Sequence, residues 1–138
     1  MINFFSETDF TLTDHDHLTD WIEATILREG FELGEISYVF CNDEFLHDIN
    51  VRYLDHDTYT DIISFDYSMG KEVHGEIYIS VERVEENALE YGVSFLDELH
   101  RVMIHGVLHY CGYKDKSERD EMEMREAEDR ALAGRDFL

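Results

Sequence analysis

The chain has 138 residues, of which 43% are hydrophobic and 13% aromatic, enough for the buried core of one folded domain and too many for a disordered chain. Its 33 acidic residues against 11 Lys and Arg give a formal net charge of -22, which argues against a surface that attracts polyanions as a whole. No apolar run approaches the roughly 20 residues that cross a bilayer, so we expect no association with a membrane.

The number and surroundings of the cysteines indicate the redox state of the compartment in which the protein works. Cys41 and Cys111 are the only two, and both lie among apolar residues. Nothing near the N-terminus resembles a cleavable signal peptide. This usage is typical of a reducing environment, so we expect a cytoplasmic protein.

The first part of the chain reads as a strand, a helix and a second strand. Residues 1–5 are a short apolar run. A helix follows, capped by Thr13 or Asp14 and ending at Gly30, with its apolar positions on one stripe. Those positions are Leu18, Trp21, Ile22, Thr25 and Ile26. Residues 36–41 are rich in side chains that favour β-strands, which predicts a second strand.

The middle of the chain predicts a helix and two strands. Asn42 begins the helix, and a polar loop over residues 55–60 follows it. The predicted buried side of this helix is Phe45, Leu46, Ile49 and Tyr53. Residues 60–67 are rich in β-branched and aromatic side chains, which favours a buried strand. After a turn at residues 68–71, residues 75–80 form the next strand, so we expect these two strands to be neighbours in one sheet.

Three helices complete the chain. Ser80 and Gly92 bound the first, Ser94 caps the second and Ser117 caps the third. The buried positions of the first two are Val81, Val84, Ala88 and Tyr91, and then Phe95, Leu99, Val102, Met103 and Val107. The third has a thin apolar face, so we expect it to lie on the surface. This order of elements predicts an α+β fold: a single domain over residues 1–138, in which a small mixed sheet of about four strands packs with about five helices.

The segment HGVLHYCGYKD, residues 105–115, carries the clearest chemistry. His105 and His109 are four residues apart, so on a helix both imidazoles would point to a common position. Gly112 is the residue type that most easily adopts the left-handed conformation that ends a helix, and a chain that reverses there can bring Asp115 under the same face. We therefore predict a metal site formed by His105, His109 and Asp115.

The spacing of these ligands matches zinc hydrolases whose site lies at the end of a helix, so we expect a zincin-like metal helix. Zinc peptidases of that pattern have Glu directly after the first His as general base. Here that position is Gly106, which opposes a peptidase. Two His and one carboxylate also suit iron, although no other feature of the sequence indicates an oxygenase.

The strand TDIISF, the strand GEIYIS and the segment HGVLHYCGYKD together resemble the YbeY family of metal-dependent endoribonucleases. That family has a Thr-Asp-Val-Leu-Ser-Phe-like strand, a Gly-Asp-Ile-like strand and a His-Gly-x-Leu-His-x-x-Gly-Tyr segment that ends in a third His. The likeness runs from about Asn50 to Asp115 and more loosely over the whole length. It implies that His105 and His109 bind one zinc ion per chain and that Asp115 replaces the third His.

The chain departs from this family at further positions. Lys114 replaces an acidic residue that commonly precedes the third ligand. Many relatives have an Arg, thought to hold or cleave RNA, where this chain has Leu54, and Arg52 lies two residues away. Arg52, Lys114 and Arg101 are the candidates for neutralising charge at a phosphate, and Gly106 would let substrate or backbone come close to the metal.

The resemblance implies a zinc-dependent endoribonuclease that cleaves single-stranded RNA. Its substrate would be ribosomal RNA, during small-subunit maturation or ribosome quality control, and partners could include a ribosomal small-subunit protein and a ribosome-assembly GTPase. Two alternatives remain: a non-catalytic ribosome-assembly factor with a structural zinc, which the missing Arg at Leu54 favours, and a zinc peptidase-like hydrolase.

Overall fold

The computed structural model describes residues 1–56 and 58–138. Its strands are β1 (Ile2–Ser6), β2 (Glu32–Cys41), β3 (Ile62–Asp66) and β4 (Glu72–Ser80). Its helices are α1 (His15–Arg28), α2 (Asp43–Leu54), α3 (Val81–Tyr91), α4 (Phe95–Tyr110) and α5 (Glu118–Ala133). In the described part of the chain, the predicted α+β class with a four-stranded sheet and five helices is therefore confirmed.

The four strands form one mixed sheet in the order β1-β2-β4-β3. β1 and β4 each pair with β2 in parallel, and β3 pairs antiparallel with β4 at one edge of the sheet. The strands predicted over residues 60–67 and 75–80 are therefore neighbours, as expected. β2 and β4 both begin earlier than predicted, because Glu32 and Leu33 pair with Glu72 and Val73 at a position where the sequence does not alternate.

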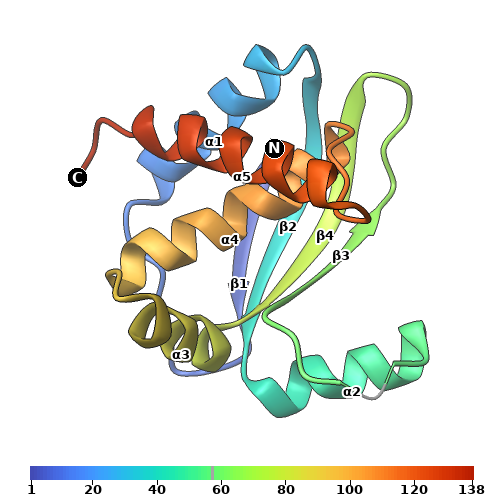
Figure 1. The fold of residues 1–138 in the computed structure, drawn as a ribbon, viewed down its shortest axis with the longest axis vertical. Helices are drawn as coiled ribbons and strands as arrows, with labels where there is room; N and C mark the ends of the chain where they lie inside the picture. The colour runs from blue at the N-terminus through green and yellow to red at the C-terminus, as the bar shows by residue number, and fades with distance from the viewer. Residues whose placement is uncertain (57) are drawn as a thin grey trace.

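One face of the sheet supports α1 and α4, and the two layers enclose the main core (Figure 1). Ile36, Tyr38, Phe40, Ile77 and Ile79 are all buried between the sheet and these helices. α2 covers the opposite face near β3, where Leu46 and Ile49 pack against Ile63 in a second, smaller core (Figure 1). Its first residue, Asp43, pairs with Arg83 of α3 at 2.8 Å. The edge strand β3 thus lies between α2 and α4.

Three serines and one asparagine begin helices as predicted. The side chains of Asn42, Ser80, Ser94 and Ser117 each accept a hydrogen bond from the backbone N–H three residues later. Asp14 begins α1 without a side-chain cap. All five predicted stripe residues of α1 are buried.

The predicted burial was wrong at several aromatic positions. Phe45 and Tyr53 on α2 and Tyr91 on α3 are exposed, because the buried stripe of each helix does not reach them: it contains Leu46 and Ile49 on α2, and Val84 and Ala88 on α3. The last helix is also more buried than predicted. Met124, Ala127, Glu128 and Ala131 of α5 are buried, and α5 lies across α4 (Figure 1).

The end of α4 is fixed to the sheet by Tyr110, whose hydroxyl donates to the backbone carbonyls of Phe65 (2.9 Å) and Glu76 (3.2 Å). Gly75 makes this contact possible, because a Cβ at that position would overlap the Tyr110 hydroxyl. α4 therefore has a defined position over β3. Across the described residues, no helix is both long and apolar enough to span a membrane.

Candidate metal centre

His105 and His109 lie in the last two turns of α4, on the side of the helix that faces the space between β3 and α2. Their Nε2 atoms are 3.0 Å apart, and the two rings are nearly perpendicular at 86°. Both side chains are about a quarter exposed, at 27% and 26%. The four-residue spacing thus brings the two imidazoles together as predicted.

Asp115 reaches the same position from the loop that follows α4. Gly112 has a φ of 98°, in the left-handed region that glycine adopts without strain, and it reverses the chain as the sequence predicts. Asp115 Oδ2 lies 3.6 Å from His109 Nε2. One ligand atom from each of His105, His109 and Asp115 falls within 4.8 Å of the other two, the only such group among the residues described.

Contacts behind the two histidines orient their rings. His105 Nδ1 lies 2.7 Å from Glu128 Oε2 on α5, and His109 Nδ1 lies 3.0 Å from the backbone carbonyl of Tyr113. An imidazole facing an acceptor at Nδ1 donates its proton there and leaves the lone pair of Nε2 free. Two such lone pairs facing each other, beside a carboxylate, suit a divalent cation of the zinc type.

The electrostatics of these groups follow from their burial and contacts. Burial lowers the pKa of His109, and the neighbouring His105 lowers it further. Burial alone would raise the pKa of Glu128, but hydrogen bonds from His105 and Arg101 outweigh it and lower that pKa. Glu128 therefore remains an anionic acceptor, and His109 favours its neutral form, the form that binds metals.

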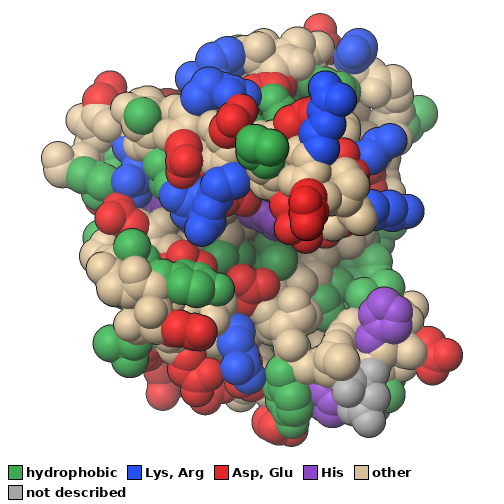
Figure 2. Space-filling view, viewed as in Figure 1, with side chains coloured by type: hydrophobic (Ala, Val, Ile, Leu, Met, Phe, Trp, Pro, Cys, Tyr) green, Lys and Arg blue, Asp and Glu red, His purple; other side chains and the backbone are tan. Residues whose placement is uncertain are grey.

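The cluster opens into a cleft of about 460 Å³ between α2, the start of β3 and α4. Its walls carry hydroxyl and amide groups as well as the ligands, including Asn50, Thr58, Thr60 and Ser64. Figure 2 shows a hollow between the half of the molecule that contains α5 and the half that contains α2, with Lys and Arg side chains gathered mainly over the former. Seven of the 11 Lys and Arg lie in residues 101–138, among nine acidic residues, so this segment holds most of the basic side chains of a chain whose net charge is -22.

The three predicted basic candidates have different positions. Arg52 is exposed and pairs with Asp48 at 3.1 Å, away from the cleft, whereas Leu54 lines it. Lys114 lies on the other side of the α4–α5 loop, beside Glu29. Arg101 lies next to His105, but its guanidinium binds Glu128 and Asp129 at 2.8 and 2.7 Å.

The prediction for Gly106 was wrong. A Cβ there would lie 3.0 Å from Ile77 Cδ1 and 3.2 Å from Ile62 Cδ1, so this glycine faces the sheet and lets α4 pack closely on it. It does not open a path to the ligands. A larger side chain, including a general-base Glu, would have to displace both isoleucines, which counts against the peptidase alternative.

The sequence did not identify three residues that the structure places beside His105: Glu128, Arg125 and Asp61. Glu128 is 5% exposed and lies on the buried stripe of α5 with Met124, Ala127 and Ala131. An acidic residue on an apolar stripe is a signal that the sequence offered, since such a group needs a buried partner. Arg125 is one turn away on the same face, and Asp61 lies beside His105 because β3 is the edge strand under α4.

Comparisons with known proteins show the family to which the chain belongs. The chain is 58% identical over 133 residues to the endoribonuclease YbeY of Flavobacterium johnsoniae, covering 96% of each protein, and 57% identical over 132 residues to that of Flavobacterium psychrophilum, covering 96% and 94%. The solution structure of TM1509 from Thermotoga maritima matches with a TM-score of 0.68 and 27% identity, over 96% of this chain and 87% of that one. The family model described as Endoribonuclease YbeY matches residues 3–135. The chain belongs to the endoribonuclease YbeY family.

Proposed function

We propose that this chain is a zinc-dependent endoribonuclease that cleaves single-stranded RNA at the cleft beside His105, His109 and Asp115. As a member of the YbeY family it is a nuclease, a hydrolase that acts on RNA. The convergence of two Nε2 atoms and one carboxylate within 4.8 Å at the wall of an open cleft is the observation that supports the proposal most directly.

The side chains of His105, His109 and Asp115 would hold one zinc ion per chain. When bound, zinc supplies a Lewis acid that stabilises negative charge developing on a phosphodiester. Glu128 and the Tyr113 carbonyl keep both imidazoles in the tautomer that presents Nε2 to the cleft. Asp115 brings a full negative charge where the family's third ligand is neutral, so basic side chains beside the cleft have more charge to balance.

Arg125 is the best placed of these basic side chains. It lies in the space next to His105 and is 62% exposed, and its one ion pair with the residues described is a long contact of 3.8 Å with Glu128. Its guanidinium is therefore available to a phosphate, in contrast to that of Arg101. Arg52 and Lys114 would contribute only to more distant parts of a bound RNA.

The shape of the cleft supports a single-stranded substrate. α2 and α4 form its two sides and β3 its floor, and its volume of about 460 Å³ suits a few nucleotides rather than a rigid duplex. We further propose that the substrate is ribosomal RNA in small-subunit maturation, in the cytoplasm, with a ribosomal small-subunit protein and a ribosome-assembly GTPase as partners. These finer assignments rest on the family resemblance.

The test compares His109→Ala with the wild type and with His17→Ala, a control that removes an exposed histidine of α1. Zinc content is measured by elemental analysis, and cleavage is measured on single-stranded RNA. We expect His109→Ala to lose both the metal and cleavage, and His17→Ala to retain both. Unchanged metal content in His109→Ala would refute the proposed site. Metal-replete wild-type protein that binds ribosomal particles without cleaving RNA would instead support the non-catalytic assembly factor.

A further inference from the structure

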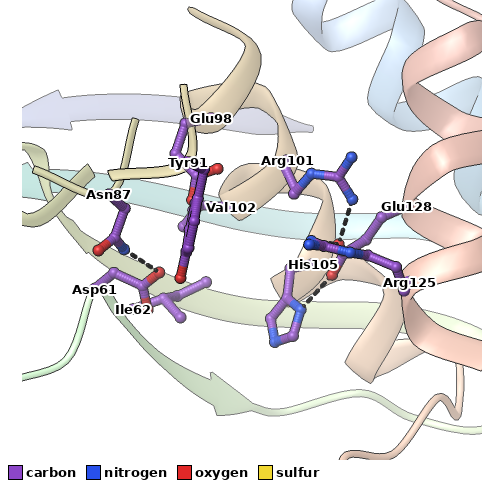
Figure 3. Close-up of a pocket in the computed structure, with 10 residues that line it drawn as sticks. All are labelled: Asp61, Ile62, Asn87, Tyr91, Glu98, Arg101, Val102, His105, Arg125 and Glu128. Carbon is purple, nitrogen blue, oxygen red and sulfur yellow. Dashed lines mark hydrogen bonds and ion pairs between the residues drawn. The ribbon is translucent and has the colours of Figure 1, made fainter. Parts of the chain in front are cut away.

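A second cavity, of about 220 Å³, lies on the other side of His105 from the metal cleft. We call it the Glu98 pocket. Figure 3 shows Asp61, Asn87, Tyr91 and Glu98 along one wall and His105, Arg101, Arg125 and Glu128 along the other. Asp61, Ile62 and His105 line both spaces, so a ligand in one is within reach of the other.

Glu98 is the unusual residue of this pocket. It is 5% exposed, yet its carboxylate accepts no hydrogen bond and forms no ion pair with any residue that the structure describes. Burial raises its pKa and the nearby carboxylate of Asp61 raises it further, while the charges of Arg101 and Arg125 act in the opposite direction. Glu98 is not sealed inside the protein: among the residues described, Arg83 Nε is the only fully buried side-chain polar atom without a partner, so the Glu98 carboxylate is accessible at the cavity that it lines. A carboxylate that is shielded by protein and open to a cavity suits a ligand that donates hydrogen bonds.

The other wall groups narrow the class of ligand. Asp61 lies 3.4 Å from the Asn87 amide and also has hydrogen bonds with the Thr60 side chain and with its own backbone N–H. A carboxylate offers about four lone-pair positions, so Asp61 can still accept from a ligand in the pocket that it lines. The ring of Tyr91 is 59% exposed at the same wall, and the side chains of Ile62 and Val102 are apolar. Two acceptor groups beside an aromatic ring suit a flat heterocycle that carries N–H donors.

We propose that the Glu98 pocket binds one base of the RNA substrate and that the base it prefers is guanine. The proposal rests on the proposed function, because it places the base of the nucleotide whose phosphate lies at the metal cleft. Guanine has two adjacent donors, N1–H and N2–H₂, on its Watson–Crick edge, which match a carboxylate. Uracil has one N–H between two carbonyl acceptors, and those acceptors would face Glu98 and Asp61 unfavourably.

A divalent cation fits this pocket less well than a base. Of the residues that the structure describes, only His105, His109 and Asp115 bring three ligand atoms within 4.8 Å of one another. Glu128, the third acidic residue of the pocket, is already held by Arg101 and His105. Asp61 and Glu98 would therefore offer a cation only two carboxylates, beside aromatic and apolar side chains.

The first test uses nucleosides, which lack phosphate and so report on the pocket without requiring RNA cleavage. Guanosine and uridine are titrated into the metal-free full chain and followed by amide chemical shifts. We expect tighter binding of guanosine, with shifts at Glu98 and Tyr91. Glu98→Gln should lower the affinity for guanosine about tenfold or more, because its amide turns a donor toward the base. Tyr91→Leu should weaken both nucleosides equally, because stacking is common to all bases.

Equal affinities for the two nucleosides, or a guanosine preference unchanged in Glu98→Gln, would overturn the proposal while leaving the nuclease function intact. The proposal would also be overturned if the wild type bound a second equivalent of zinc or manganese and Glu98→Gln did not. Glu85→Gln removes the same charge from an exposed position of α3 and should behave as the wild type. Glu98→Gln should melt at the same temperature as the wild type or higher; a lower melting temperature would assign Glu98 a structural role instead.

The second test asks whether the preference appears in cleavage. Two single-stranded oligonucleotides, one with a single guanosine in a uridine background and one of uridine alone, are digested by metal-loaded protein. We expect the wild type to cut next to guanosine, and Glu98→Gln to show a smaller ratio of cleavage at that position. A ratio that is the same in both proteins would contradict a guanine subsite, and absence of cleavage in the wild type would bear on the proposed function alone.

Discussion

Glu128 shows how much the candidate metal site would depend on a residue outside the three candidate ligands. Its carboxylate receives His105 Nδ1 at 2.7 Å through one oxygen and Arg101 Nη1 at 2.8 Å through the other. It thereby fixes the tautomer of one ligand and the position of α5 over α4. Removing such a partner of a ligand histidine typically weakens metal binding about 10- to 100-fold.

We expect Glu128→Gln to lower zinc affinity within that range of about 10- to 100-fold, because the amide cannot replace the charge that faces His105 and Arg101. Competition with a chromogenic chelator measures the affinity. Glu126→Gln, an exposed change of the same kind on α5, should leave it unaltered. Equal affinities in all three proteins would show that Glu128 only packs the helix pair.

The residues of the site differ in how far the sequence predicts them. His105 and His109 are four residues apart on one helix, so local geometry alone brings them together. Asp115 needs only the reversal at Gly112. Glu128 lies 23 residues beyond His105, and Asp61 lies just before β3, so both depend on how α5 and β3 pack against α4. Local periodicity contains no information about that packing.

At the scale of elements, the C-terminal segment holds three helices together. Arg135, just after α5, donates to His100 Nδ1 at 2.8 Å and to Asp97 Oδ1 at 2.9 Å on α4. Trp21 of α1 donates to the carbonyl of Ala131 at 2.7 Å, and its ring lies beside His100. His100 must be neutral to accept from Arg135. Burial, and then the charge of Arg135, lower the pKa of His100 to about 4.

This arrangement predicts a specific loss of stability in acid. The unfolded chain binds a proton at His100 near pH 6.5, whereas the folded chain binds it only near pH 4. Stability from this group is therefore complete above pH 6.5 and is lost as the pH falls toward 4. We expect the free energy of unfolding, measured with urea at pH 7.5 and pH 4.5, to fall by about 2 to 3 kcal/mol more in the wild type than in His100→Gln. Gln accepts from Arg135 at every pH, and parallel losses in both proteins would contradict the assignment.

Element boundaries show the same division between local and non-local information. The serine and asparagine caps predict the starts of four helices because each cap is a hydrogen bond between residues only three positions apart in the sequence. The early start of β2 at Glu32 depends on its pairing with Glu72, forty residues away. The exposure of Phe45 and Tyr53 likewise depends on which side of α2 the sheet covers, which apolar periodicity on α2 does not reveal.

At the scale of the whole molecule, the charge distribution should make folding and RNA binding respond to salt in opposite directions. The net charge of -22 produces self-repulsion in the folded state, which added salt screens. The basic residues that would contact RNA are concentrated in residues 101–138, and salt weakens such contacts. For single strands, the slope of log affinity against log salt is about -0.7 per neutralised phosphate.

Raising sodium chloride from about 0.05 to about 0.5 M should therefore raise the midpoint of urea unfolding while lowering affinity for single-stranded RNA, over a range in which the screening length shortens several-fold. Arg125→Gln should make the slope for RNA shallower by about 0.7, since it removes one phosphate contact beside His105. Arg52→Gln, which removes an equal charge outside the cleft, is the matched control and should change the slope less. Identical slopes for the two variants would mean that RNA reaches the metal centre by a route that Arg125 does not border.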